Sequence, residues 1–243
     1  MKIVGVIPAR YRSSRFPGKP LILIDGVPMI IRVARIVEKA LGLQNTYIAT
    51  DDLRIHEVVE SNGYNAIMTS QNCLTGTDRL WDFAKKVKAD IYINIQGDEP
   101  LLNPLDIIKI AEVKAKFNDY VVNGMCEIIN EDENDRNIPK VLVNKNNRLI
   151  YMSRLPIPAI KSLDSDTPTY FKQVCIYGFN YNDLQMFGQN DRKAYYEKFE
   201  DIEILRFFDL NIPIMMVKTS GSSLAVDIPS DVDKVENYLK NIK

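Results

Sequence analysis

The sequence predicts an α/β protein with a doubly wound, mostly parallel sheet, and two observations lead to this fold class. Short apolar runs of strand length recur along the chain, and segments with apolar residues at helical spacing separate them. Such alternation supplies the crossover connections that parallel strands need, with helices covering both faces of the sheet. We expect a Rossmann-like arrangement in a single domain covering residues 1–243.

The elements of the first half follow from their local patterns. The strands expected there are short and mostly apolar: 2–7, 44–50, 64–68 and 89–96. The helices place apolar residues at helical spacing: 28–41, 53–63, 78–87 and 104–116. Ligands of such sheets bind outside the carboxyl ends of the strands, so the loops at those ends are the candidate site.

The second half predicts a different kind of pairing. Residues 121–129 and 172–180 have the composition of strands, and 140–154 is expected to form a hairpin that turns at 145–147. These segments follow one another without the intervening helices that parallel pairing requires. We therefore expect 140–180 to be an antiparallel extension of the sheet.

Composition excludes several classes of protein. Hydrophobic residues make up 46% and the formal net charge is −1, which is ordinary for a soluble globular protein and gives no global field for nucleic acid. Cys73, Cys126 and Cys175 lie far apart and form no disulfide framework, which favours a reducing cytoplasm. No apolar run approaches about 18 residues, so we expect no membrane insertion.

The loop after the first strand, IPARYRSSRFPGKPL (7–21), is strongly basic. It contains Arg10, Arg12, Arg15 and Lys19, and no acidic residue accompanies them. Guanidinium groups match phosphate oxygens, and an ammonium group adds a compact positive charge. The loop has neither a Walker pattern nor G-x-G-x-x-G. The alternative is a solvated basic loop, or one that pairs with acidic residues elsewhere in the chain. Its place at a strand end, its glycine and its lack of acidic residues favour a phosphate site.

Two aspartates are candidate metal ligands. Asp98 follows the strand 89–96 within NIQGDEP, and Asp227 is expected to end a strand before a helix that begins after Pro229. Mg²⁺ commonly binds through one or two carboxylates together with substrate phosphates and water. Each stretch alone is equally compatible with an ordinary turn or helix start.

A third stretch, LTGTDRL (74–80), precedes a helix. Gly76 between two threonines suits an anion or a base ring at a helix N-terminus. Asp78 is equally compatible with a simpler role, as a negative charge that complements the helix dipole.

Taken in order, these and other stretches resemble one family. The stretches are PARYRSSRFPGKPL, TGTDR, NIQGDEP, YMSRLPIP, IYGF, EDIEILR and VDIPSD. Together they resemble the 3-deoxy-manno-octulosonate (Kdo) cytidylyltransferases, the CMP-Kdo synthetases of bacterial envelope biosynthesis. The resemblance covers essentially the whole chain. Sialic-acid-activating relatives begin with a G-G-S-K-G type loop in place of PGKPL, which favours the Kdo branch.

The resemblance implies a GT-A-like nucleotidyltransferase fold and a specific reaction. CMP passes from CTP to the anomeric hydroxyl of Kdo, pyrophosphate leaves, and Mg²⁺ is required. Family members are homodimers, which makes 140–180 the expected dimerisation region. Such chemistry depends mainly on positioning and charge neutralisation, so it needs the cations and carboxylates noted above.

The resemblance also implies residue roles. The nucleotide would be bound by Arg10, Ser13, Arg15, Lys19, Thr75, Gly76, Arg79 and Gln96. The sugar acid would be bound by Gln96, Arg154, Gln173, Tyr177, Glu200, Glu203 and Arg206. Asp98 and Asp227 would hold the metal and, with Lys19 and Arg10, would be the catalytic groups.

The chain departs from the family pattern at two histidines. Cys73 stands where H-x-S-G-T-D-R has its first residue, and Gln173 stands where K-H-I-G-I-Y has histidine. The glycine of the second motif is Cys175. Because glutamine cannot become cationic, we hypothesise a modified acceptor, with the 8-amino analogue of Kdo as leading candidate. The alternative is sequence drift with an unchanged substrate.

Other functions stay open from sequence. One is a nucleotidyltransferase that activates another nonulosonic acid or a phosphosugar. Another is a nucleotide-binding regulatory module without turnover, although a binder needs no second carboxylate such as Asp227. A GT-A glycosyltransferase is less favoured, because its metal motif is D-x-D and the sequence here is DEP.

Overall fold

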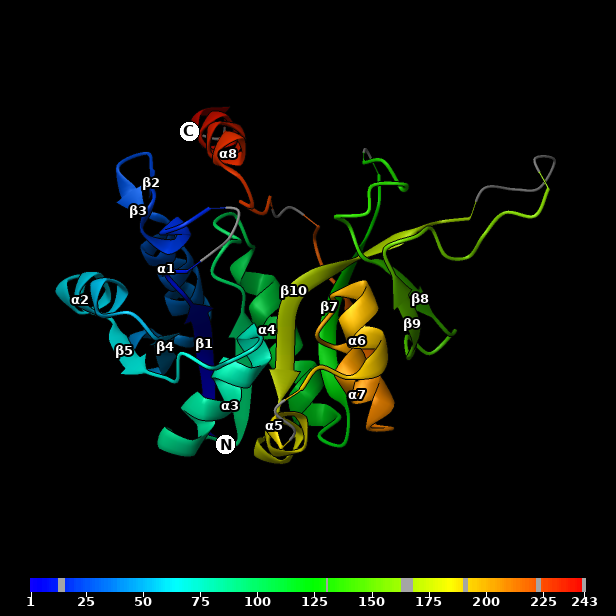
Figure 1. Cartoon of the computed structure of the whole chain (residues 1–243), viewed down its shortest axis with the longest axis horizontal. Helices are drawn as coiled ribbons and strands as arrows, with labels where there is room; N and C mark the ends of the chain where they lie inside the picture. The colour runs from blue at the N-terminus through cyan, green and yellow to red at the C-terminus, as the bar shows by residue number, and fades with distance from the viewer. Residues whose placement is uncertain (13–15, 130, 163–167, 190–191, 222–223, 242–243) are drawn as a thin grey trace.

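A nine-stranded sheet forms the centre of the computed structural model, which describes residues 1–12, 16–129, 131–162, 168–189, 192–221 and 224–241. The strands of its main path are β1 (Ile3–Ala9), β4 (Thr46–Thr50), β5 (Asn65–Met68), β6 (Ile91–Ile95), β7 (Val121–Glu127), β10 (Phe171–Phe179) and β11 (Ile214–Lys218). Their spatial order is β11-β7-β10-β6-β1-β4-β5. The expected α/β fold with a mostly parallel sheet is confirmed (Figure 1).

Helices cover both faces of this sheet, as alternation predicts. One face packs against α1 (Met29–Leu41), α2 (Leu53–Ser61) and α4 (Pro104–Lys116). The other packs against α3 (Gly76–Lys86), α5 (Tyr181–Gly188) and α7 (Leu205–Asp209). Helix α6 (Tyr195–Glu200) lies next to α7 and contacts β9 (Leu149–Ser153) through the Tyr196 and Tyr151 rings (Figure 1). Strand β1 is buried along nearly its whole length, so it reads in the sequence as a continuous apolar run rather than an alternating one.

The antiparallel pairing is present, but its place differs from expectation. Strand β10 runs antiparallel to both β6 and β7 and lies between them, inside the sheet rather than beyond its edge. The hairpin of β8 (Lys140–Val143) and β9 (Leu149–Ser153) pairs with the start of β10 and projects from the sheet (Figure 1). The difference arises because β7 and β11 pair in parallel and extend the sheet past β10.

Two expectations for the C-terminal third are corrected. Residues 224–227 form no strand; the strand of this region is β11, and Val226 makes a main-chain bond to Asp98 instead, with its N–H 2.9 Å from the carbonyl oxygen. The helices α5, α6 and α7 were not expected from sequence. The predicted final helix is present as α8 (Pro229–Asn241) and begins at the proline itself, one residue earlier than expected.

A small satellite core anchors α8 beside the start of the chain. Val235 of α8 packs with Ile24, Met29 and Val226, next to the short hairpin of β2 (Leu23–Ile24) and β3 (Val27–Pro28). Lys19 begins the short 3-10 helix η1 (Lys19–Leu21) in the same region; a second, η2 (Leu43–Asn45), precedes β4. This packing places α8 against the segment that follows the basic loop. In the part of the chain that is described, no helix has both the length and the hydrophobicity needed to cross a bilayer.

Candidate active site

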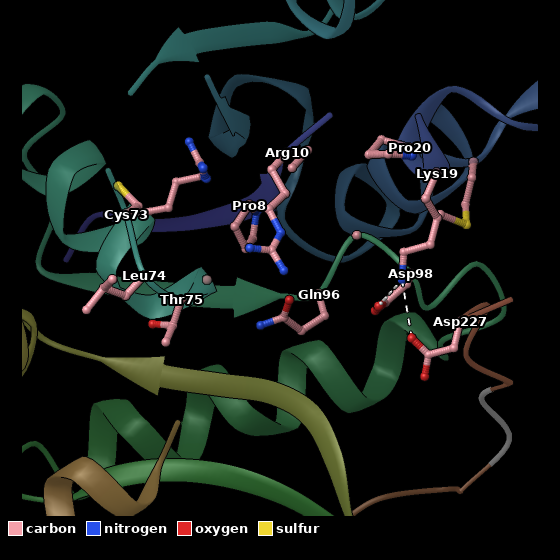
Figure 2. A pocket seen from close by; sticks show the side chains of 15 residues that line it. Pro8, Arg10, Lys19, Pro20, Cys73, Leu74, Thr75, Gln96, Asp98 and Asp227 are labelled. Atoms are coloured by element: carbon pink, nitrogen blue, oxygen red, sulfur yellow. Dashed lines mark hydrogen bonds and ion pairs between the residues drawn. The ribbon is translucent and has the colours of Figure 1, made fainter. Parts of the chain in front are cut away.

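The site lies where the order of the parallel strands reverses. The chain passes from β1 outward to β4 and β5, and then returns to place β6 on the other side of β1. Loops that follow β1 and β6 diverge at this point and leave a crevice, which is the usual ligand site of such sheets. A cavity of about 210 Å³ occupies it (Figure 2). This smaller cavity is lined by residues that include Arg10, Lys19, Thr75, Gly76, Arg79, Gln96, Asp98 and Asp227.

Lys19 joins the two predicted carboxylates. Its Nζ lies 2.8 Å from Asp98 Oδ2 and 3.5 Å from Asp227 Oδ1, and it also donates to the Val226 carbonyl oxygen at 2.9 Å. Figure 2 shows the ammonium group between the two carboxylates. The predicted convergence of the basic loop and two distant aspartates on one point is therefore present. Asp98 and Asp227 are held near each other by the main-chain bond from Val226.

The backbone before Lys19 sets its direction. Gly18 has φ of 73°, in the left-handed region that glycine enters without strain, and caps η1. The Gly18 N–H donates to the Tyr11 carbonyl oxygen at 2.9 Å, which closes the basic loop. Arg10 lines the smaller cavity from the same loop. Ser13 and Arg15, also predicted to bind nucleotide, lie outside the described residues.

The donor set around Lys19 fits a hard divalent cation. An ammonium group already lies among two carboxylates and a carbonyl oxygen, so these oxygens can approach one cation, and oxygen ligands are the ones that Mg²⁺ prefers. Among the described residues, no three histidine, cysteine or carboxylate side chains are grouped as a metal site. Asp98 and Asp227 are the two side chains that could hold Mg²⁺ here, with phosphates and water as its other ligands.

The start of α3 forms another wall. Thr75 caps the helix: its hydroxyl accepts from the Asp78 N–H at 3.2 Å, and Asp78 accepts from the Thr75 N–H at 2.9 Å. Asp78 therefore has the capping role that the sequence allowed. Gly76 faces Gln96 so closely that a Cβ atom there would lie 2.8 Å from the Gln96 Nε2. The glycine leaves room for the Gln96 side chain.

Arg79 lines the smaller cavity, yet its guanidinium group already has partners. It is 3% exposed and donates to Asp51 Oδ2 at 2.9 Å and to the Thr69 hydroxyl at 2.6 Å. These contacts tie α3 to the ends of β4 and β5. They favour a supporting role for Arg79 at the nucleotide site over direct donation to phosphate.

Gln96 lies between the smaller cavity and a larger one. Its Nε2 donates to Glu203 Oε1 at 3.1 Å, while the other oxygen of Glu203 accepts from the Thr77 N–H at 3.0 Å. Burial raises the pKa of the Glu203 carboxyl above its ordinary value, although the bond from Thr77 opposes this shift. Glu203 fixes the Gln96 amide where the two cavities meet.

The larger cavity has a volume of about 1020 Å³ and contains most of the residues predicted for the sugar acid. Its lining includes Gln96, Arg154, Gln173, Tyr177, Glu200 and Glu203, and it shares Arg10, Thr75, Gly76, Asp98 and Asp227 with the smaller cavity. Cavities with common walls can hold two reactants next to each other. This is the arrangement that a group transfer requires.

Arg154 lies at the larger cavity but donates to the main chain. Its guanidinium contacts the carbonyl oxygens of Glu200 at 2.6 Å, Asp201 at 3.0 Å, Arg136 at 2.9 Å and Asn137 at 3.2 Å. Glu200 in turn accepts from the Arg154 N–H at 2.8 Å. The arginine therefore joins the loop before β8 to the end of α6, which differs from the expected pairing with a substrate carboxylate.

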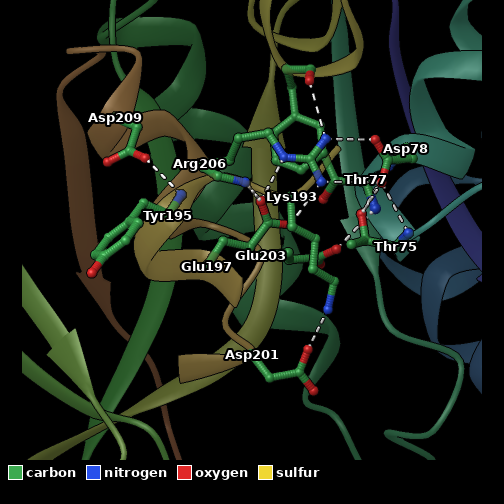
Figure 3. A network of polar contacts seen from close by, with 12 residues as sticks. Thr75, Thr77, Asp78, Lys193, Tyr195, Glu197, Asp201, Glu203, Arg206 and Asp209 are labelled. Carbon is green, nitrogen blue, oxygen red and sulfur yellow. Dashed lines mark hydrogen bonds and ion pairs between the residues drawn. The ribbon is translucent and has the colours of Figure 1, made fainter. Parts of the chain in front are cut away.

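Arg206 lies outside the lining of both cavities. It is 3% exposed, and its guanidinium pairs with Asp78 at 2.7 Å and with Glu197 at 2.7 Å (Figure 3). Glu197 itself lines the larger cavity. Arg206 thus connects the capped start of α3 to α6, which is a positioning role rather than the substrate contact expected from sequence.

The two positions at which the family motifs have histidine both lie at the site. Cys73 lines the smaller cavity, and Gln173 lines the larger one, where its Nε2 donates to Asn123 Oδ1 at 2.9 Å. Neighbouring Cys175 and Tyr177 also line the larger cavity, and burial raises the pKa of each well above its ordinary value. Neither the thiol nor the phenol is therefore ionised near neutral pH.

Some functional groups could not be found from the sequence. The Val226 carbonyl is a backbone atom, which no side-chain pattern identifies. Glu197 and Lys193 belong to the region of α5 to α7, where weak periodicity gave no prediction. Lys172 lines the larger cavity and pairs with Glu131 at 2.5 Å; its only sequence signal was charge inside a strand.

Comparison with known proteins places these features in a family. The family model described as cytidylyltransferase matches residues 4–214. A 3-deoxy-manno-octulosonate cytidylyltransferase of Escherichia coli is 37% identical over 235 residues, covering 96% of this chain and 94% of that protein. An 8-amino-3,8-dideoxy-manno-octulosonate cytidylyltransferase of Shewanella pealeana is 38% identical over 240 residues, covering 96% of each.

Solved structures agree with this placement. A CMP:2-keto-3-deoxy-manno-octonic acid synthetase complexed with CTP superposes with a TM-score of 0.93 at 35% identity, covering 100% of both chains. A cytidylyltransferase from Leptospira borgpetersenii superposes with a TM-score of 0.66 at 15% identity, covering 99% of this chain and 87% of that one. At this identity the similarity shows a shared fold and no more. The chain therefore belongs to the cytidylyltransferase family, in the group of the 3-deoxy-manno-octulosonate cytidylyltransferases.

Proposed function

We propose that this chain transfers CMP from CTP to the anomeric hydroxyl of Kdo and releases pyrophosphate. The observation that carries the proposal is the convergence of Lys19, Asp98 and Asp227 on the wall shared by the two cavities. A triphosphate in the smaller cavity and a sugar acid in the larger one would meet there. In a bacterium the product would serve lipopolysaccharide or capsule synthesis.

The residues at that wall suit the reaction. The anomeric oxygen attacks the α-phosphorus, its proton passes to solvent, and the bond to the pyrophosphate oxygen breaks. Arg10 and Lys19 would balance the charge that accumulates on the leaving pyrophosphate. Asp98 and Asp227 would hold Mg²⁺, which polarises phosphate oxygens when it is bound. Gln96, fixed by Glu203, would orient the reactants where the cavities meet.

Pyrophosphate release tests the function. Purified protein should release pyrophosphate from CTP only when Kdo and Mg²⁺ are both supplied, and other nucleotides should react more slowly. Binding of CTP without any release, across a panel of sugar acids, would favour a regulatory nucleotide-binding module instead.

An 8-amino analogue of Kdo is a second candidate acceptor. Gln173 replaces a family histidine in the larger cavity, and the carboxylates of Asp135 and Glu200 line that cavity and would attract an ammonium group. Competing Kdo and its 8-amino analogue in one assay separates the candidates. A strong preference for unmodified Kdo would remove the second.

We also propose that the chain forms a homodimer through the β8–β9 hairpin and α6. Large apolar side chains are exposed there: Ile150 is 47% exposed, Leu155 55%, Tyr195 68% and Phe199 69%. The hairpin and α6 adjoin through the Tyr151 and Tyr196 rings, and exposed apolar groups gathered on adjoining elements mark interaction surfaces. Light scattering after size exclusion should give twice the chain mass, and Phe199→Asp should lower it. A monomer at all concentrations tested would contradict the proposal.

A further inference from the structure

Lys19 neutralises the carboxylates that Mg²⁺ would need. Its ammonium contacts Asp98 Oδ2, Asp227 Oδ1 and the Val226 carbonyl oxygen, at 2.8, 3.5 and 2.9 Å. The Lys19 side chain is 17% exposed, and the side chains of Asp98 and Asp227 are 27% and 40% exposed. The ammonium group is therefore the better shielded member of the cluster, and water screens its attraction to Asp98 only in part.

The ammonium group and a divalent cation compete for the same place. Both seek the Asp98 oxygen that Lys19 now contacts, and two cations that share one oxygen at such short range repel each other. A metal ion arriving alone would have to displace Lys19 from three acceptors and offer it nothing in return. While Lys19 keeps these contacts, a group of the protein itself closes the site to metal.

A triphosphate changes this balance. Lys19 lines the smaller cavity with Arg10, so its flexible stem can carry the ammonium from the carboxylates onto phosphate oxygens. That movement removes the ammonium group from the aspartate oxygens that a cation would contact, and the same phosphates supply further oxygen ligands.

We propose that Lys19 is an internal counter-cation that keeps Asp98 and Asp227 closed to divalent metal until a nucleoside triphosphate draws its ammonium away. Metal loading is thereby coupled to nucleotide binding, and the protein does not hold Mg²⁺ before CTP arrives. The inference rests on the proposed function, since it takes the aspartate pair as the metal site. It adds an order of events and a role for Lys19 before any chemistry.

Metal binding without nucleotide tests this directly. Electron paramagnetic resonance of free Mn²⁺ reports how much metal a protein solution binds. Lys19→Met should bind Mn²⁺ roughly tenfold more tightly than the wild type, because a charge-assisted contact no longer has to be broken. Lys19→Arg keeps the positive charge and should bind Mn²⁺ as weakly as the wild type.

Lys109→Met is the matched control. Lys109 donates to the Lys218 carbonyl oxygen at 2.7 Å, away from the cavities, so the variant removes the same charge without touching the aspartates. Its Mn²⁺ affinity should equal that of the wild type. Asp98→Asn in the Lys19→Met background should abolish the gain, which identifies where the metal binds. Circular dichroism on each variant confirms that it is folded.

Two results would overturn the proposal. One is a Lys19→Met protein that binds Mn²⁺ no better than the wild type; the other is an equal gain in Lys109→Met. The measurement uses no acceptor and no turnover, so its failure is distinct from failure of the proposed function. If the wild-type protein releases pyrophosphate normally but Lys19→Met shows no gain in Mn²⁺ affinity, the proposed function stands and only the counter-cation role of Lys19 is wrong.

Discussion

Replacing Gly76 with alanine tests whether the Gln96 side chain must lie against the start of α3. A methyl carbon at position 76 would lie 2.8 Å from the Gln96 Nε2 and 3.3 Å from its Oε1. Carbon atoms do not remain that close, so one side must move, and the end of the glutamine side chain is the more easily displaced. We expect its amide to leave Glu203, which accepts from it at 3.1 Å.

Two opposing effects set the magnitude. Alanine in place of glycine within a helix stabilises by about 0.5–1 kcal/mol at most, and Gly76 is the first residue of α3. Loss of a hydrogen bond to a charged carboxylate costs about 1.5–3 kcal/mol. If that cost falls on the transition state, kcat/KM drops roughly 10- to 150-fold. The variant should remain folded, with an unchanged or slightly higher Tm, while turnover falls.

A double-mutant cycle provides the assay. Pyrophosphate release is measured for the wild type, Gly76→Ala, Gln96→Ala and the double variant, with thermal unfolding recorded for each. If alanine acts by displacing Gln96, it has no further effect once that side chain is gone, and the double variant should match Gln96→Ala. Losses that multiply in the double variant would mean that the methyl group acts on the nucleotide itself, and the proposed link through Gln96 would be wrong.

Three other substitutions and one pH profile have defined outcomes. Asp227→Asn should remove Mg²⁺-dependent pyrophosphate release with an unchanged circular dichroism spectrum; a wild-type rate would exclude this residue as a metal ligand. Arg206→Met removes the cation that pairs with buried Glu197 and half-buried Asp78, and it should lower the free energy of unfolding in urea by about 3–5 kcal/mol; a loss below about 1 kcal/mol would contradict the network in Figure 3. Lys140 donates to the carbonyl oxygens of Asp135, Ile138 and Arg154, which line the larger cavity, so Lys140→Met should raise KM for the sugar acid while leaving CTP affinity unchanged. The reverse pattern would show that Lys140 does not hold this wall in place. Burial raises the pKa of Cys126 to about 11, so its alkylation by iodoacetamide should rise about tenfold per pH unit up to that value, and a plateau near pH 8.5 would show an ordinary thiol.

The pKa of Cys126 also has a consequence for stability. The thiol titrates near its ordinary value in the unfolded chain and at about 11 in the folded protein. Its contribution to the free energy of unfolding is therefore fully present below the ordinary pKa and is lost as pH rises through about 11.

Much of the fold could be predicted because its signals are local. The apolar runs that became β1 and β6 are buried on both faces, and the helix periodicity of α1 and α4 reflects packing on the same sheet. The insertion of β10 between β6 and β7 depends on pairings distant in sequence, which no local pattern contains. The short α6 and α7 have too few turns for a clear periodicity.

The site was predictable in its residue types more than in their roles. Lys19 and the two aspartates carry charge at strand ends or loops, and a charge clustered there indicates a ligand. Arg154 and Arg206 were expected at the substrate, but sequence cannot show that their guanidinium groups are already taken by carbonyls and carboxylates of the protein. Roles of this kind depend on neighbours that only the folded structure assembles.

A crystal structure with CTP and Mn²⁺ would show whether Lys19, Asp98 and Asp227 all lie at one bound polyphosphate. Anomalous diffraction locates the metal without assumptions about its ligands. We expect a single strong peak bound by both aspartates, with the Lys19 ammonium moved onto a phosphate oxygen. A peak remote from Asp98 and Asp227, or a Lys19 that still contacts Asp98 beside bound CTP, would contradict this assignment of the site.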